Sequence, residues 1–222
     1  MIPLSDTPKA RHFPWVMVAI VVLNVLVFVY ELSLGRLIEP WMQTWGVIPT
    51  ELLRGRGAVT LITSMFIHGG FLHIGSNMLF LWVFGDNVED ALGHGGFLVF
   101  YLAAGIIAGL THTFVNAASE VPSVGASGAI AGVLGAYLLL FPDAKVRTLL
   151  FLGPFFTLAR IPAVLMIGFW FVTQLITGLV ALEVETASGG VAVWAHIGGF
   201  LAGGFVGIVR RGSTAATRQQ AP

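Results

Sequence analysis

The chain contains no cysteine and few charged residues for its length. Without cysteine, neither a disulfide nor a thiolate metal site can form. Charged residues make up 10% of the 222 residues, whereas a soluble domain carries roughly 25%. The 11 basic and 11 acidic residues balance, so no basic excess indicates nucleic acid as a partner. With 56% hydrophobic residues and a mean hydropathy of +0.89, polar groups cannot cover the surface, and lipid must be the main solvent.

Six apolar stretches are candidates for membrane spans, each of which needs about 20 residues. They cover residues 15–34, 71–88, 95–116, 127–141, 161–182 and 190–209. The first is longer than the roughly 7–15 apolar residues of a signal peptide and lacks a small-x-small cleavage site after it, so we interpret it as a retained helix. The fourth is short, which predicts that its start at Ser127 lies below the membrane surface. The pattern predicts an all-α, polytopic membrane protein with a bundle of six transmembrane helices.

The basic residues predict the orientation of this bundle. With six spans both termini lie on one side, and that side holds eight of the 11 basic residues. They are Lys9, Arg11, Lys145, Arg147, Arg160, Arg210, Arg211 and Arg218. Because basic loops stay in the cytoplasm, we expect a cytoplasmic segment at 1–14, a membrane domain at 15–209 and a cytoplasmic tail at 210–222.

The stretch Val124-Gly125-Ala126-Ser127-Gly128 places one serine among small residues at the start of the fourth span. A hydroxyl at this position can cap the helix by accepting from backbone N–H groups. It can also act as a nucleophile, because the free N–H groups of the first turn stabilise a negative oxygen beside it. Taken alone, a run of small residues in an apolar helix more often indicates a packing surface.

Polar residues inside membrane spans are costly and usually mark function. In the predicted orientation the second, fourth and sixth spans all begin at the outer face. The second carries His73 and Asn77, whose spacing of four places both on one helix face. His196 lies about two turns into the sixth span. We therefore expect these three residues and Ser127 at similar depth.

Two sets of glycines predict which helix faces meet. They are Gly128, Gly132 and Gly135 on the fourth span, and Gly199, Gly203 and Gly207 on the sixth. Small residues at this spacing let helix backbones approach closely in lipid. Close packing of these two helices would bring His196 within reach of Ser127.

The residue types favour a Ser-His dyad. A hydrogen-bonded histidine can accept the proton of an otherwise weak serine nucleophile. His73, Asn77 and the Ser127 N–H are suitable donors to an oxyanion. No acidic residue occurs in the apolar part of these helices, so a third, carboxylate member is not expected.

Two other interpretations of the same polar residues stay open. Two histidines and an asparagine could hold a metal, but no carboxylate or cysteine is nearby and the H-E-x-x-H spacing is absent, so we expect no metal and no cofactor. A small transporter would show inverted repeats, and we find no convincing repeat.

The chain resembles the rhomboid family of intramembrane serine proteases over roughly residues 15–209. Three motifs carry the resemblance: Gly125-Ala126-Ser127-Gly128, Ala195-His196-Ile197-Gly198-Gly199 with Gly203, and His73-x-x-x-Asn77. Residues 63–73, which lead into the second span, and Gly85-Asp86-Asn87-Val88-Glu89 at its other end are also similar to the family. The first three motifs, each on the appropriate helix, are specific when they occur together.

This resemblance implies that Ser127 is the nucleophile, that His196 is the general base, and that His73 and Asn77 help to form the oxyanion hole. It also implies cleavage of transmembrane protein substrates near the outer face of a bacterial plasma membrane, among membrane lipids and without a cofactor. Two departures bear on activity: Val59-Thr60 replaces the family's frequent Trp-Arg pair in the first loop, and Ala131 replaces an aromatic that packs on the histidine. The alternative is an inactive relative that binds membrane clients.

Overall fold

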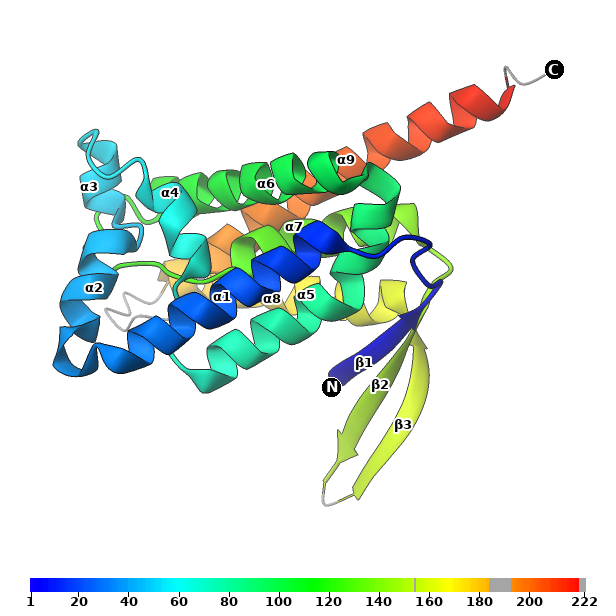
Figure 1. Ribbon diagram of the computed structural model, residues 1–222, viewed down its shortest axis with the longest axis horizontal. Coiled ribbons are helices and arrows are strands. Elements are labelled where there is room, and N and C mark those ends of the chain that lie inside the picture. Colours follow the sequence, from blue (N-terminus) through cyan, green and yellow to red (C-terminus); the bar gives the residue numbers. More distant parts are fainter. Residues whose placement is uncertain (154, 184–192, 220–222) are drawn as a thin grey trace.

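The computed structural model describes residues 1–153, 155–183 and 193–219, and it is mainly helical (Figure 1). The long helices are α1 (Trp15–Ser33), α5 (Phe71–Leu92), α6 (His94–Val115), α7 (Ser127–Leu140), α8 (Ala163–Glu183) and α9 (Val193–Gln219). Shorter helices precede α5: η1 (Gly35–Leu37), α2 (Ile38–Trp45), α3 (Pro49–Leu53), α4 (Thr60–Thr63) and η2 (Ser64–Phe66). Figure 1 shows α2 and α3 at one end of the bundle and a β-sheet at the other.

The predicted helical, polytopic membrane fold is confirmed. Within the described residues, α1, α6, α8 and α9 are each long and apolar enough to cross a membrane. The α4–η2 segment and α5, bent by 96° at their junction, give a fifth candidate. The remaining predicted span is the shorter apolar helix α7, so the count of six stays a prediction. Residues 190–192, which were predicted to begin the last span, lie outside the described residues.

Helix α7 forms the centre of the bundle. It packs against α5, α6, α8 and α9, and its residues from Gly128 to Tyr137 are all buried. A helix that contacts other helices on every side needs no lipid-facing surface. Its small residues therefore serve close packing.

The predicted glycine contact between α7 and α9 is confirmed. A Cβ added at Gly199 or Gly203 would collide with the carbonyl oxygens of Gly128 and Gly132, respectively. A Cβ at Gly135 would collide in turn with the carbonyl oxygen of Phe200. The two backbones are therefore in direct contact along the length of α7.

A three-stranded antiparallel sheet, β1 (Ile2–Thr7), β2 (Lys145–Leu152) and β3 (Phe155–Pro162), was not predicted. Residues 143–160 were expected to be a loop, but Val146 and Thr148 are buried while Lys145 and Arg147 are exposed. This alternation is typical of a half-buried strand. Asp6 fixes β1 to the bundle by accepting hydrogen bonds from Tyr137 and Asn87. Burial raises the pKa of the Asp6 carboxyl, and these hydrogen bonds act in the opposite direction.

The start of α1 is held by a buried carboxylate on α5. Glu89 accepts hydrogen bonds from the backbone N–H groups of Val16 (3.0 Å) and Met17 (2.7 Å). These groups have no partner inside their own helix, and a negative charge at a helix N-terminus is stabilising. At the other end of the chain, α9 continues past the predicted end of its span to Gln219.

Candidate active site

Ser127 is the first residue of α7 and is half-buried. The preceding residue, Ala126, provides no side-chain cap, so the first N–H groups of the helix are not satisfied by a capping side chain. The Ser127 hydroxyl is likewise not used as a cap. It makes its hydrogen bond to a side chain on another helix.

That side chain is His196 on α9, which is 6% exposed. The Ser127 Oγ lies 2.8 Å from His196 Nε2, and Gln174 Oε1 lies 2.7 Å from His196 Nδ1. An amide oxygen only accepts, so Nδ1 carries the proton and donates it to Gln174. Nε2 is then the acceptor and receives the hydroxyl proton of Ser127. This tautomer is the one that can take a proton from a serine.

Helix α8 contributes a second side chain against the histidine. The rings of Trp170 and His196 have centroids 5.7 Å apart at an interplanar angle of 41°. Trp170 and Gln174 are four residues apart and therefore lie on one helix face. Ala131, where the family often has an aromatic, is fully buried. The ring that packs on His196 therefore comes from α8, and the substitution at Ala131 does not leave the histidine unsupported.

The role of this face of α8 was not predicted. The predicted site residues Ser127, His196, His73 and Asn77 include neither Gln174 nor Trp170. A signal was present, because Gln174 is a polar residue inside an apolar span. The sequence alone did not show that the face of α8 carrying Gln174 and Trp170 meets α9.

His73 packs closely against the backbone of Gly125 beside Ser127. The Gly69 N–H donates to His73 Nδ1 (3.2 Å), which leaves the proton of His73 on Nε2. Gly125 has φ +126°, and a Cβ there would lie 2.7 Å from His73 Nε2 and 3.7 Å from Ser127 Oγ. Glycine is required here because the backbone has a positive φ and because any Cβ would collide with the His73 ring.

Asn77, one turn after His73 on α5, is 7% exposed. Its Nδ2 is buried and has no hydrogen-bond partner among the described residues. A buried amide donor without a protein partner costs free energy, so this N–H group is free to donate to a ligand or a transition state.

The loops next to Ser127 are tied together without the family's Trp-Arg pair. Val47 and Ser123 exchange two backbone hydrogen bonds of 3.0 and 2.8 Å, and Gly125 N donates to Ser64 O at 2.8 Å. Thr60 belongs to the Val59-Thr60 pair that replaces Trp-Arg, and its hydroxyl donates a local hydrogen bond to Gly57 O at 2.6 Å. The segment that carries Ser127 is therefore anchored through its backbone.

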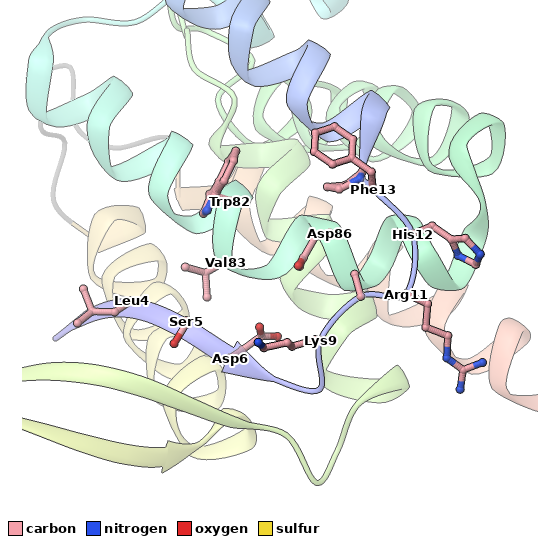
Figure 2. A pocket seen from close by; sticks show the side chains of 12 residues that line it. Leu4, Ser5, Asp6, Lys9, Arg11, His12, Phe13, Trp82, Val83 and Asp86 are labelled. Carbon is pink, nitrogen blue, oxygen red and sulfur yellow. The ribbon is translucent and has the colours of Figure 1, made fainter.

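Across the described ranges, no three His, Asp or Glu side chains form a group that could hold a metal ion. An open pocket of about 520 Å³ lies between the N-terminal segment and the second half of α5, lined by Asp6, Lys9, His12, Trp82 and Asp86 among others (Figure 2). His73 and Asn77 lie in the first half of α5, so this pocket is separate from the candidate active site.

Fold and site together define a helical membrane protein with a hydrogen-bonded serine–histidine pair between two of its central helices. Residues 55–213 match the Rhomboid domain model, which is well over half of the chain. The chain belongs to the rhomboid family.

Curated relatives support this assignment. The chain is similar to rhomboid protease GluP of Bacillus subtilis, 31% identical over 201 residues, which is 90% of this chain and 36% of that protein. It is also similar to mitochondrial rhomboid protein 1 of Saccharomyces cerevisiae, 34% identical over 142 residues, which is 61% of this chain and 39% of that protein. Mitochondrial presenilin-associated rhomboid-like protein of Bos taurus is 37% identical over 103 residues, which is 44% of this chain and 26% of that protein. The aligned regions thus span less than half the length of these relatives.

Proposed function

We propose that the chain is an intramembrane serine endopeptidase that uses Ser127 as nucleophile and His196 as general base. The observation that carries this proposal is the hydrogen bond from Ser127 Oγ to His196 Nε2, with Nδ1 of the same ring donating to Gln174. Family membership agrees with a protease-like function.

In the first step, the Ser127 hydroxyl proton passes to His196 Nε2 while Oγ attacks the carbonyl carbon of the scissile peptide. The tetrahedral oxyanion accepts hydrogen bonds from the Ser127 N–H, His73 Nε2–H and Asn77 Nδ2–H. The C–N bond then breaks, and the leaving amine takes the proton from Nε2. Water, deprotonated by His196, finally hydrolyses the ester on Ser127.

Gln174 acts as a positioning residue in this scheme. Its Oε1 accepts from Nδ1–H throughout, which holds the reactive tautomer and stabilises the imidazolium that forms. A neutral amide fills the place that a carboxylate holds in a Ser-His-Asp triad. Trp170 fixes the plane of the ring from the same helix.

The substrates we propose are transmembrane proteins, since Ser127 lies inside an apolar bundle among membrane lipids. A peptide bond in an intact helix has its carbonyl hydrogen-bonded internally, so the substrate must unwind locally before attack. We further propose a bacterial plasma-membrane location with both termini cytoplasmic, on the basis of the basic-residue distribution.

The test is labelling of the detergent-solubilised chain with a fluorophosphonate probe. We expect modification of Ser127, no labelling of Ser127→Ala, and none of His196→Ala with an unchanged thermal unfolding curve. Gln174→Leu should slow labelling, whereas Gln174→Glu, which keeps an acceptor, should recover part of the rate. Labelling of another serine, or unchanged labelling of His196→Ala, would refute the dyad, and a wild type that does not label would favour the inactive, client-binding alternative.

A further inference from the structure

The hairpin formed by β2 and β3 ends in an exposed aromatic tip. Phe151, Phe155 and Phe156 are 57%, 74% and 74% exposed. Phe151 pairs with Phe156 and shares its face of the sheet, whereas Phe155 is one residue away in the strand and lies on the other face. Apolar side chains therefore cover both faces of the tip, and Figure 1 shows the hairpin leaving the bundle at the end opposite α2 and α3 and slanting away below the helices.

Closer to the bundle, the same hairpin concentrates positive charge. Arg147 and Arg160 are directly opposite each other in the ladder and are both exposed, and Lys145 follows on the same face. Like charges at directly opposed positions destabilise a sheet. In the part of the chain that the structure describes, no ion pair includes any of these three residues. An anionic group from outside the chain would therefore stabilise these opposed arginines.

Side-chain character changes from basic to apolar along the hairpin, from the bundle to the tip. The basic pair Arg147 and Arg160 comes first, then Leu149 opposite Leu158, then the phenylalanines of the tip. On β1, Ile2 pairs with Leu149 and extends the apolar layer. Figure 2 places Lys9 and Arg11 on the segment that follows β1, at the same end of the bundle. A bilayer presents the same order, with phosphate groups outside and hydrocarbon within.

We propose that this sheet is a lateral membrane anchor. Its aromatic tip inserts into the leaflet at the end of the bundle that carries the sheet, and Arg147 and Arg160 bind the phosphates of anionic phospholipids. Lipid is favoured as the occupant because the hairpin leads directly into α8, whose first turn exposes Val164 and Leu165 (46% and 62%), so exposed apolar side chains flank the basic pair on both sides. This anchor does not depend on the catalytic proposal.

The absence of native cysteine allows a direct test, because one introduced cysteine carries a unique label. We would attach a nitrobenzoxadiazole fluorophore at Phe156→Cys and reconstitute the full chain into phosphatidylcholine vesicles. Nitroxide-labelled lipids should quench this fluorophore strongly, and phosphatidylglycerol should quench more than phosphatidylcholine at equal mole fraction. The control label at Ala118→Cys, in an exposed loop at the opposite end of the bundle, should be quenched little. A Phe156 label quenched no more than the Ala118 label overturns the anchor.

The arginines are tested in the Phe156→Cys background. Arg147→Gln combined with Arg160→Gln should lower the preference for phosphatidylglycerol over phosphatidylcholine by about 30-fold, from the typical contribution of two basic residues near an anionic surface. Arg36→Gln, which removes a charge at the other end of the bundle, should leave the preference unchanged. An undiminished preference in the double variant overturns the headgroup assignment. Dipolar broadening between nitroxides at position 156 on two copies, lost on dilution with unlabelled chain, would show that a second copy covers the tip and would overturn the lipid assignment.

Discussion

Replacing Gly203 by alanine should separate Ser127 from His196 without touching either residue. The added Cβ would lie 2.6 Å from the carbonyl carbon of Gly132 and nearer still to its oxygen. An ordinary contact needs about 3.4 Å, so clearing the carbonyl carbon alone moves α9 by about 0.8 Å relative to α7, and clearing the nearer oxygen requires a larger shift. If α9 moves away from α7 as a rigid helix, the Ser127–His196 distance grows from 2.8 Å to at least about 3.6 Å, which is no longer a hydrogen bond.

Two effects follow from this shift. Overpacking of a close contact costs about 1–3 kcal/mol of stability. A misplacement of this size in a catalytic pair lowers activity by about 10²-fold. We would measure the fluorophosphonate labelling rate and cleavage of a single-span substrate, together with thermal unfolding in detergent.

The matched control is the neighbouring glycine. A Cβ at Gly204 would meet its nearest atom, Leu139 Cδ1, at 3.8 Å, an ordinary contact. Gly204→Ala shares the gain in helix propensity, about 1 kcal/mol, and should keep wild-type activity. If Gly203→Ala and Gly204→Ala label at the same rate, the direct backbone contact does not position the dyad, and the reasoning fails.

Three further predictions concern the site and its orientation. Asn77→Ala should lower kcat by about 10²–10³ with a smaller change in KM, as for loss of an oxyanion donor, and a wild-type kcat would contradict that role. Gly125→Ala should abolish labelling because its Cβ collides with the His73 ring and displaces it, whereas Gly75→Ala, with no atom within 4 Å, should not; equal labelling would refute the steric argument. A reporter fused after residue 222 should be active only in the cytoplasm and one after Ser119 only outside, and the reverse pattern would invert the proposed topology.

The proximity of Ser127 and His196 could be predicted because it depends on few quantities. Helix direction follows from counting spans, depth follows from position within each span, and the facing surfaces follow from glycines at a spacing of four. None of these requires the detailed shape of a loop. The same information does not fix the rotation of α8 about its axis, so the contacts of Gln174 and Trp170 with His196 could not be derived.

The sheet could not be predicted for a different reason. Leu149 and Leu158 lie within an apolar stretch too short for a span, and apolar runs of this length do not distinguish a strand from a buried helix segment. The partner strand, β1, lies more than a hundred residues away and contains Pro3, which is unfavourable in a strand interior. Pairing of this kind depends on the bundle bringing both segments to one end.

Glu89 also has a consequence for biosynthesis. The ribosome completes α1 long before it reaches residue 89, so the first N–H groups of α1 enter the membrane without the carboxylate that later binds Val16 and Met17. Until α5 packs beside it, that end of α1 is satisfied by water at the interface. The first helix therefore gains the partner of its N-terminal N–H groups only after a later helix has been synthesised.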